Sequence, residues 1–315
     1  MAGKIATRNA YGDALVELGE KYPQLVVLDA DLAGATMSKG FKAAFPDRFF
    51  DCGIAEANMT DIAAGMSTCG YKPFTNTFAV FATGRAYEQV RNSIAYPRLN
   101  VTVVGSHGGV SVGEDGATHQ CIEDFALMRA VPGMLVCCPC DGYEMRQAVE
   151  ALINYEGPAY LRLQRPATEI FTDEIEGYHF ELGKSVLIRE GSDITIIASG
   201  ITVAMAAKAS DTLKEEGISA RVINMHTIKP LDEEAVLAAA KETGCILTVE
   251  EHSIIGGLGG AVCEYLASAC PVPVVRHGVI DEFGRSGTAN AVLEYFGLTP
   301  EVIAEKAKQT LKLKK

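Results

Sequence analysis

Apolar runs of strand length alternate with longer stretches of helical periodicity along the first half of the chain. Because these runs are apolar almost without interruption, we expect strands buried on both faces, as in a parallel sheet that helices cover. The runs assigned to strands are 24–32, 48–54, 72–84, 99–107, 134–141 and 158–166, and the helical stretches between them are 39–46, 55–70, 85–97, 119–131 and 142–157.

The alternation breaks near residues 167–185, where a polar stretch follows the last of these runs. A second, shorter alternation then begins, so we predict an α/β fold made of two parallel-sheet α/β domains. We place the first domain at 1–170, a linker at 171–185 and the second domain at 186–315. In the second domain the expected strands are 193–200, 220–228, 245–251 and 272–279, and the expected helices are 203–217, 232–244, 259–269, 291–297 and 300–315.

Composition and charge narrow the functional classes. Of the 315 residues, 48% are hydrophobic and 22% are charged, which is a globular composition. No apolar run approaches the roughly 20 residues that span a membrane, and the N-terminus lacks the apolar segment of a signal peptide. We therefore expect a cytoplasmic protein without a membrane partner. The formal net charge of −12 argues against nucleic acid as a partner.

Cysteine and glycine strings carry little chemistry on their own. The nine cysteines are an odd number, which fits reduced thiols better than a disulfide framework. Cys137 and Cys140 form a Cys-x-x-Cys string, but a zinc site needs a second ligand pair, which is not evident. We interpret this string as packing at a strand end. The GGLGG string at 256–260 departs from the dinucleotide pattern at Val262, so we interpret it as tight strand–helix packing.

Candidate chemistry concentrates at the carboxyl ends of the strands in the first domain, where open parallel sheets bind ligands. Glu56 follows a strand and opens a helix, where a carboxylate can also serve simply as a stabilising helix charge. The Gly-rich segment 105–120 holds His107 and His119 with acidic residues between them. A Ser-His-Asp triad or a metal site is conceivable there. We expect neither a nucleophile elbow nor a compact metal spacing, and hydrogen bonding to a polyhydroxylated substrate fits better.

Three strings in this region resemble the pyrimidine-binding domain of transketolases: VGEDGATHQ at 112–120, GIAEANM at 53–59 and RLQRP at 162–166. The resemblance extends over nearly the whole chain and matches the pyrimidine and C-terminal domains of a full-length transketolase. It implies a thiamine-diphosphate enzyme that transfers a two-carbon ketol unit from a ketose phosphate to an aldose phosphate, as in the pentose phosphate pathway.

The resemblance implies a central role for Glu56. In transketolases the matching glutamate hydrogen-bonds N1′ of the cofactor's aminopyrimidine and promotes its imino tautomer, whose 4′-nitrogen removes the C2 proton of the thiazolium. A carboxyl that hydrogen-bonds a pyrimidine nitrogen must be held protonated or share a proton. Because apolar burial raises the pKa of a carboxyl in that direction, we expect an apolar surrounding for Glu56. The next residue is Ala57, where many single-chain members have histidine, so a role for that histidine is not carried over.

The same resemblance assigns cofactor contacts. Phe78 and Phe81 match aromatic residues that border the aminopyrimidine ring, although ordinary core packing would also explain them. The third aromatic of that pocket falls near Phe74 or Thr75, where the match is poor. Asp31 and Leu32 match a segment beside the cofactor, and a helix-capping aspartate is the alternative for this pair.

Substrate contacts follow from the remaining matches. His107, Asp115 and His119 match residues that bind the hydroxyls of donor and acceptor sugars, and a histidine there can also shuttle a proton. Arg165 matches the arginine that binds the sugar phosphate, because its planar fork suits a phosphate. Arg162 is either an accessory to this site or a partner in a surface salt bridge.

The sequence lacks one half of the expected cofactor site. Thiamine enzymes of this class hold the diphosphate through Mg²⁺ bound by GDG and a later Asn, and GDG does not occur in this chain. The resemblance therefore implies the C-terminal subunit of a split transketolase, with the Mg²⁺ ligands on an N-terminal partner subunit and an α2β2 heterotetramer. The alternatives are a deoxyxylulose-phosphate-synthase-like subunit, a 2-oxoacid-dehydrogenase-β-like subunit and a non-catalytic scaffold homologue.

Overall fold

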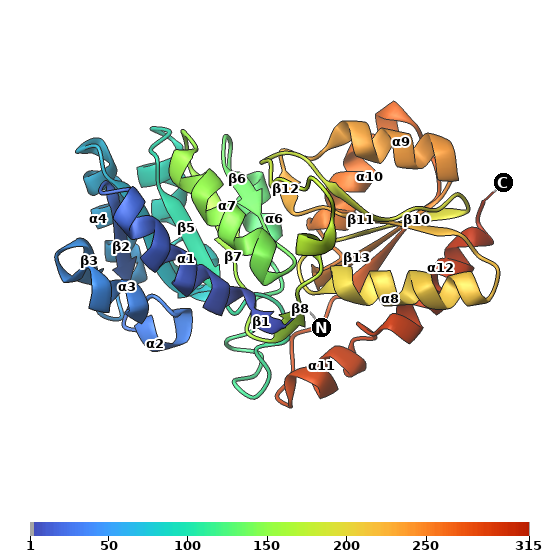
Figure 1. The fold of residues 1–315 in the computed structure, drawn as a ribbon, viewed down its shortest axis with the longest axis horizontal. Coiled ribbons are helices and arrows are strands. Elements are labelled where there is room, and N and C mark those ends of the chain that lie inside the picture. The colour runs from blue at the N-terminus through green and yellow to red at the C-terminus, as the bar shows by residue number, and fades with distance from the viewer. Residues whose placement is uncertain (1–2, 315) are drawn as a thin grey trace.

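The computed structural model describes residues 3–314, which form two α/β units side by side (Figure 1). The first unit is built on a seven-stranded sheet of order β12-β6-β7-β5-β4-β2-β3. All strands pair in parallel except the edge strand β12, which pairs antiparallel with β6. The strands are β2 (Leu25–Asp29), β3 (Phe49–Asp51), β4 (Lys72–Phe78), β5 (Thr102–Ser106), β6 (Leu135–Cys137), β7 (Ala159–Arg162) and β12 (Thr227–Lys229).

Helices cover both faces of this sheet, because its central strands are apolar on both sides. One face packs against α1 and α7, and the other packs against α4, the turns that follow β4, and α6. The helical segments are α1 (Thr7–Lys21), α2 (Ala33–Thr36), α3 (Lys39–Ala44), η1 (Pro46–Arg48), α4 (Glu56–Thr68), η2 (Phe81–Arg85), α5 (Tyr87–Gln89), η3 (Val90–Ala95), α6 (Asp124–Ala130) and α7 (Gly142–Asn154).

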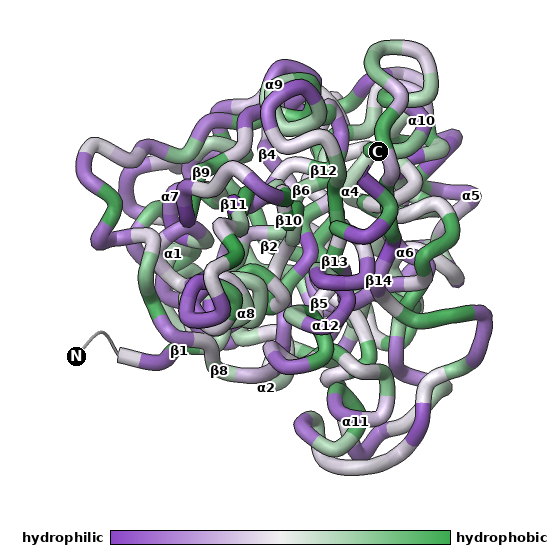
Figure 2. Tube along the Cα trace, turned by 90° about the vertical axis from the view of Figure 1, so that its right-hand side faces the viewer, coloured by the Kyte–Doolittle hydropathy of each residue, from purple (hydrophilic) through white to green (hydrophobic). Residues whose placement is uncertain are grey.

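The second unit is built on a five-stranded sheet of order β14-β13-β10-β11-β9, in which only β9 is antiparallel to its neighbour. Hydrophobic positions concentrate in the interior around β10, and hydrophilic positions are frequent on outer loops and helices (Figure 2). The strands are β9 (Val186–Arg189), β10 (Ile194–Ala198), β11 (Ala220–Asn224), β13 (Ile246–Ser253) and β14 (Val274–Val279), and the helices are α8 (Thr202–Glu215), α9 (Glu233–Thr243), α10 (Leu258–Ala269), α11 (Ala289–Tyr295) and α12 (Pro300–Leu311).

The segment between the units is tied to the first unit. It contains β8 (Ala167–Glu169), which pairs antiparallel with β1 (Lys4–Ala6), and the short turn η4 (Thr172–Glu174). The buried carboxylate of Asp141 accepts hydrogen bonds from the N–H and the hydroxyl of Thr172. The segment is thus held against α7 by specific polar contacts, although it has little regular structure.

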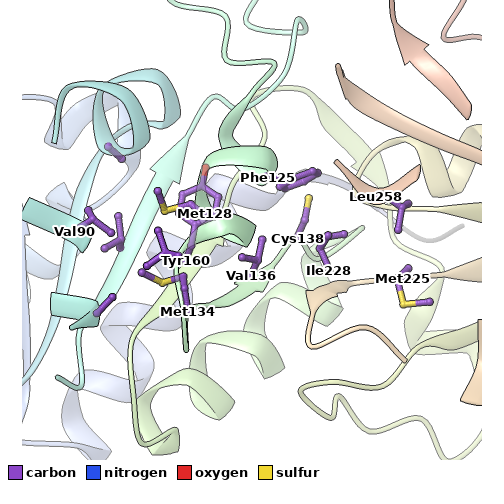
Figure 3. Close-up of a cluster of buried hydrophobic side chains, with 14 of the residues drawn as sticks. Val90, Phe125, Met128, Met134, Val136, Cys138, Tyr160, Met225, Ile228 and Leu258 are labelled. Carbon is purple, nitrogen blue, oxygen red and sulfur yellow. The ribbon is translucent and has the colours of Figure 1, made fainter. Parts of the chain in front are cut away.

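The predicted fold class is confirmed, but local predictions at 72–84, 85–97 and 220–228 are wrong. The run 72–84 is a strand only as far as Phe78, and the π-turn η2 follows it. The run 220–228 is not one strand: it divides into β11 and β12, and β12 crosses to the sheet of the first unit. The stretch 85–97 is not a regular helix, because Phe81–Arg85 and Val90–Ala95 have π-helical hydrogen bonding. The apolar core also continues across the two units, where Phe125 and Cys138 lie in one cluster with residues such as Met225 (Figure 3).

The GGLGG string packs tightly, as predicted. A Cβ atom added to Gly257 would lie 2.0 Å from the Glu250 carboxylate, and one added to Gly259 would lie 2.6 Å from Thr248 Oγ1. The buried Glu250 accepts hydrogen bonds from the N–H groups of Leu258 and Gly259 at the start of α10. Burial raises the pKa of Glu250 to about 7.

A buried ion pair lies at the boundary between the units, so the surface salt bridge proposed for Arg162 is wrong. The Arg162 side chain is buried, and its Nε lies 3.3 Å from Asp124 Oδ2. Its Nη2 donates to the backbone oxygen of Glu251 in β13, and its guanidinium lies 4.5 Å from the centroid of the Phe125 ring. The hydroxyl of Tyr160 donates a hydrogen bond to the same carboxylate, at 2.7 Å from Asp124 Oδ2. These contacts join β7 of the first unit to β13 of the second.

We predict that Arg162→Leu lowers the free energy of unfolding by about 3–5 kcal/mol, because it leaves the buried Asp124 carboxylate without its cation. The midpoint of urea denaturation, followed by circular dichroism, measures this change. Arg189→Leu is the control, since it removes an exposed pair with Asp211 and should change the stability by less than about 1 kcal/mol. Equal shifts for the two variants would contradict the prediction.

Candidate active site

Glu56 is the first residue of α4, and its side chain is only 3% exposed. Arg85 Nη1 donates to both carboxylate oxygens, at 2.9 Å from Oε1 and 3.0 Å from Oε2. The expected apolar surrounding is therefore only part of the environment of Glu56. The guanidinium of Arg85 is also part of it, and none of the sequence motifs predicts this contact.

Phe78 and Phe81 lie together beside this pair. Phe78 ends β4 and Phe81 begins the π-turn η2, and their rings are nearly parallel with centroids 6.1 Å apart. The Arg85 guanidinium lies 4.5 Å from the centroid of the Phe81 ring. Phe74 is buried in the core against α1 and α7, so the structure does not bring it to this site.

Both predicted histidines border the same aromatic pair. The His107 ring centroid lies 4.2 Å from that of Phe78. The His119 ring meets both phenylalanines edge-on, with centroids 6.1 Å from Phe78 and 5.5 Å from Phe81. The carboxylate of Glu56, two aromatic rings and two imidazoles thus gather at one edge of the sheet.

The contacts of His107 fix its tautomer. Arg8 Nη1 lies 3.1 Å from His107 Nε2, and Ser106 Oγ lies 2.8 Å from His107 Nδ1. A guanidinium only donates hydrogen bonds, so Nε2 accepts from Arg8 and Nδ1 carries the proton and donates to Ser106. Burial, followed by the nearby positive charges of Arg8 and Arg165, lowers the pKa of His107 to about 3. The imidazole is therefore neutral at physiological pH.

Arg165 and Arg8 place two positive charges near His107. Arg165 Nη1 donates to the backbone oxygen of Val112 and lies 3.1 Å from Glu114 Oε2. Burial, together with the charge of Arg165, lowers the pKa of Arg8. The sequence did not identify Arg8 as a site residue, because it lies in the first turn of α1 and outside the recognisable motifs.

Asp115 is exposed beside Glu114, at the tip of the loop that carries His119. The second unit holds this loop. Glu251 Oε1 accepts a hydrogen bond from the N–H of Ser111 at 2.6 Å, and Gln120 Nε2 donates to the backbone oxygen of Arg285 at 2.8 Å. The C-terminal unit therefore contributes to the site by positioning the loop that carries His119.

Ser111 corrects one sequence expectation, because GVSVG at 109–113 does have the G-x-S-x-G spacing. Ser111 nevertheless lies buried in the loop after β5 and is not at a turn from a strand into a helix. A Cβ atom added to Gly109, whose φ is 84°, would lie 2.2 Å from the Glu251 carboxyl carbon. The glycine serves close packing against the second unit, and the geometry is not that of a hydrolase elbow.

Asp31 and Leu32 follow β2, which is the neighbour of β4 in the sheet. Asp31 is exposed with φ of 61°, and Leu32 is half-buried. The buried Asp29, and not Asp31, bonds this turn: its carboxylate accepts hydrogen bonds from the N–H of Leu32 and the hydroxyls of Thr36 and Ser38. Burial raises the pKa of Asp29 to about 6. The alternative that Asp31 caps the helix is therefore wrong.

Other candidate sites are weak. The Cys137 and Cys140 thiols are buried, and burial raises the pKa of each above its usual range, which suits packing better than redox chemistry. Within residues 3–314 we find no group of three or more His, Cys, Asp or Glu side chains that could hold a metal ion. In the same part of the chain, no helix is long and apolar enough to cross a membrane.

Comparison with known proteins agrees with this arrangement. The family model for the transketolase pyrimidine-binding domain matches residues 3–169, and that for the transketolase C-terminal domain matches residues 183–303. A 6-deoxy-6-sulfo-D-fructose transketolase subunit of a Clostridium strain is 45% identical, over 98% of this chain and 95% of its own. Human transketolase is 40% identical over 96% of this chain, which corresponds to 48% of the human protein.

Among solved structures, a split-gene transketolase described as an inactive β4 tetramer superimposes with a TM-score of 0.91. It is 49% identical, and the match covers 99% of this chain and 100% of that one. The chain therefore belongs to the transketolase family and comprises that family's pyrimidine-binding and C-terminal domains.

Proposed function

We propose that this chain is the subunit of a two-chain transketolase that holds the pyrimidine ring of thiamine diphosphate. The enzyme transfers a two-carbon ketol unit from a ketose phosphate to an aldose phosphate in the cytoplasm. The observation that carries this proposal is the meeting of the Glu56 carboxylate, the parallel rings of Phe78 and Phe81, and His107 and His119 at one sheet edge.

The residues present fit the proposed cofactor. A planar guanidinium already lies against the Phe81 ring and hydrogen-bonds Glu56, so the site accepts a flat group of this kind. Glu56 would hydrogen-bond the pyrimidine nitrogen, Phe78 and Phe81 would border the ring, and Asp31 and Leu32 would lie beside the cofactor. When bound, thiamine diphosphate supplies the electron sink for the ketol carbon.

The neighbouring polar groups suit a sugar phosphate. His107 is held neutral, and His119 and Asp115 lie on the adjoining loop, so together they offer donors and acceptors for sugar hydroxyls. Arg8 and Arg165 bring two guanidiniums into one region of an acidic protein, and an anion between them would relieve their repulsion. We assign the phosphate of the sugar to these two arginines.

The partner subunit is part of the proposal. A solved relative from a split gene forms an inactive tetramer of β subunits, and human transketolase has about twice the length matched by this chain. Both facts support an N-terminal subunit that brings the diphosphate half of the site and the Mg²⁺ ligands, in an α2β2 heterotetramer. The Clostridium relative named for a sulfosugar widens the range of donors to be tested.

We predict that the purified chain shows no ketol transfer with thiamine diphosphate, Mg²⁺ and xylulose 5-phosphate until the co-purified partner subunit is added. The half-site in this chain lacks the groups that hold the diphosphate, so binding of the cofactor is incomplete. A coupled assay of aldose release measures the activity. Turnover by the chain alone would refute the two-subunit proposal, and activity with pyruvate in place of the ketose would favour a synthase-like reaction.

Glu56→Ala should abolish turnover of the reconstituted complex while leaving its assembly unchanged, since the carboxylate pairs with Arg85, whose half-exposed guanidinium stays solvated without it. Size-exclusion chromatography checks the assembly, and the ketol-transfer assay checks the activity. Glu264→Ala, which removes an exposed partner of Arg129, is the control and should keep full turnover. Activity that survives Glu56→Ala would show that the glutamate has been assigned wrongly.

Arg165→Leu should raise KM for a phosphorylated ketose by at least about tenfold with a smaller change in kcat, because it removes a charged hydrogen bond to the phosphate. KM for an unphosphorylated ketol donor should stay the same, which separates phosphate binding from a general loss of structure. Arg146→Leu, at an exposed arginine paired with Asp13, is the control. An equal rise in KM for both donors would contradict the phosphate assignment.

A further inference from the structure

Arg85 fills the space between Glu56 and Phe81. Its Nη1 lies 2.9 Å and 3.0 Å from the two oxygens of the Glu56 carboxylate. Its guanidinium carbon lies 4.5 Å from the centroid of the Phe81 ring. The Glu56 side chain is 3% exposed, whereas that of Arg85 is 53% exposed. The Arg85 side chain thus extends from solvent into the site, where its guanidinium contacts the Glu56 carboxylate and the Phe81 ring.

These two contacts are those that a flat heteroaromatic ring would need. A guanidinium is planar, stacks on aromatic faces and donates hydrogen bonds in its own plane. A pyrimidine ring bordered by Phe81 and hydrogen-bonded to Glu56 would use the same ring face and the same carboxylate. Since two groups cannot occupy one position, the ring and the guanidinium exclude each other.

We propose that Arg85 is an internal occupant of the ring subsite, which pairs with Glu56 until the cofactor ring displaces it. The inference rests on the proposed function, because it takes the ring of thiamine diphosphate as the competing ligand. A buried carboxylate without a partner is strongly destabilising, so the arginine compensates the charge of Glu56 while the ring is absent. The ring then replaces this charge pair with a hydrogen bond.

Local structure gives Arg85 room to leave. It is the last residue of the π-turn η2, and single π-turns occur mostly as insertions within helices, often at functional sites. The preceding Gly84 has open space where a side chain would be, since an added Cβ would meet no atom within 4 Å. A half-exposed arginine beside such a space can turn its charged end into water without unpacking the core.

The test is the affinity of the reconstituted complex for thiamine diphosphate in the presence of Mg²⁺, measured by isothermal titration calorimetry. Arg85→Gln removes the competing guanidinium, so the cofactor should bind about tenfold more tightly than to the wild type. The reason is that apparent affinity rises with the fraction of molecules in which the ring subsite is open. Arg91→Gln is the matched control, at an exposed arginine whose Nη1 contacts the Asn92 side chain, and should leave the dissociation constant unchanged. Unchanged or weaker binding by Arg85→Gln overturns the inference.

A double-mutant cycle separates this role from a general structural one. In Glu56→Gln the carboxylate that attracts Arg85 is gone, so adding Arg85→Gln should change the dissociation constant by less than about twofold. A full tenfold effect in that background would show that Arg85 acts without Glu56 and would overturn the inference. Arg85→Lys keeps the positive charge but lacks the planar guanidinium, so its affinity for thiamine diphosphate should lie between those of the wild type and Arg85→Gln.

The two proposals fail in different ways. If the wild-type complex binds no thiamine diphosphate, the proposed function fails, and the inference fails with it. If the wild-type complex binds the cofactor and Arg85→Gln does not bind it more tightly, only the inference fails. Circular dichroism and the urea midpoint of each variant confirm that the chain is folded before titration.

Discussion

The parallel pairing of the first sheet is the constraint on which the site depends. Strands in the order β7-β5-β4-β2-β3 run in one direction, so their carboxyl ends meet at one edge. A candidate site residue lies at or just after each of these ends. Arg165 follows β7, His107 follows β5, Phe78 and Phe81 lie at and after the end of β4, Asp31 and Leu32 follow β2, and Glu56 follows β3. The chain separates these groups by more than a hundred residues, and the sheet brings them together.

Charge placement decides what each group at this edge can do. The protein carries a net charge of −12, yet three arginines, Arg8, Arg85 and Arg165, lie at this edge. Two of them, Arg8 and Arg165, act together with burial to keep His107 neutral, so its ring carries a proton on one nitrogen and a lone pair on the other. Burial, which removes water from the imidazolium, lowers the pKa of His107 more than the two guanidiniums do. An anion bound by the two arginines would weaken the second effect and leave the first.

Much of this arrangement could be predicted from the sequence, because it depends on strand ends and on short strings. The periodicity of the runs is enough to predict the fold class, and the rule that open parallel sheets bind ligands at the carboxyl ends of their strands points to Glu56 and the two histidines. Asp29 and Asp31 show where this reasoning stops, since both follow the same run and only the buried one accepts the hydrogen bonds of the turn. Arg85 could not be found, because a π-turn has no periodicity of its own that distinguishes it from a helix.

The second unit explains why the site needs more than the first sheet. The loop from His107 to His119 is rich in glycine and would be free to move if it were anchored only at its two ends. Glu251 and Gln120 fix it between the units, and Arg162 joins the same strand, β13, to β7. A buried charged cluster of this kind contributes little net stability, because desolvation offsets most of the attraction. Its contacts nevertheless constrain the geometry, because they hold β13 and Glu251 against β7, and Glu251 in turn bonds the loop that runs from His107 to His119.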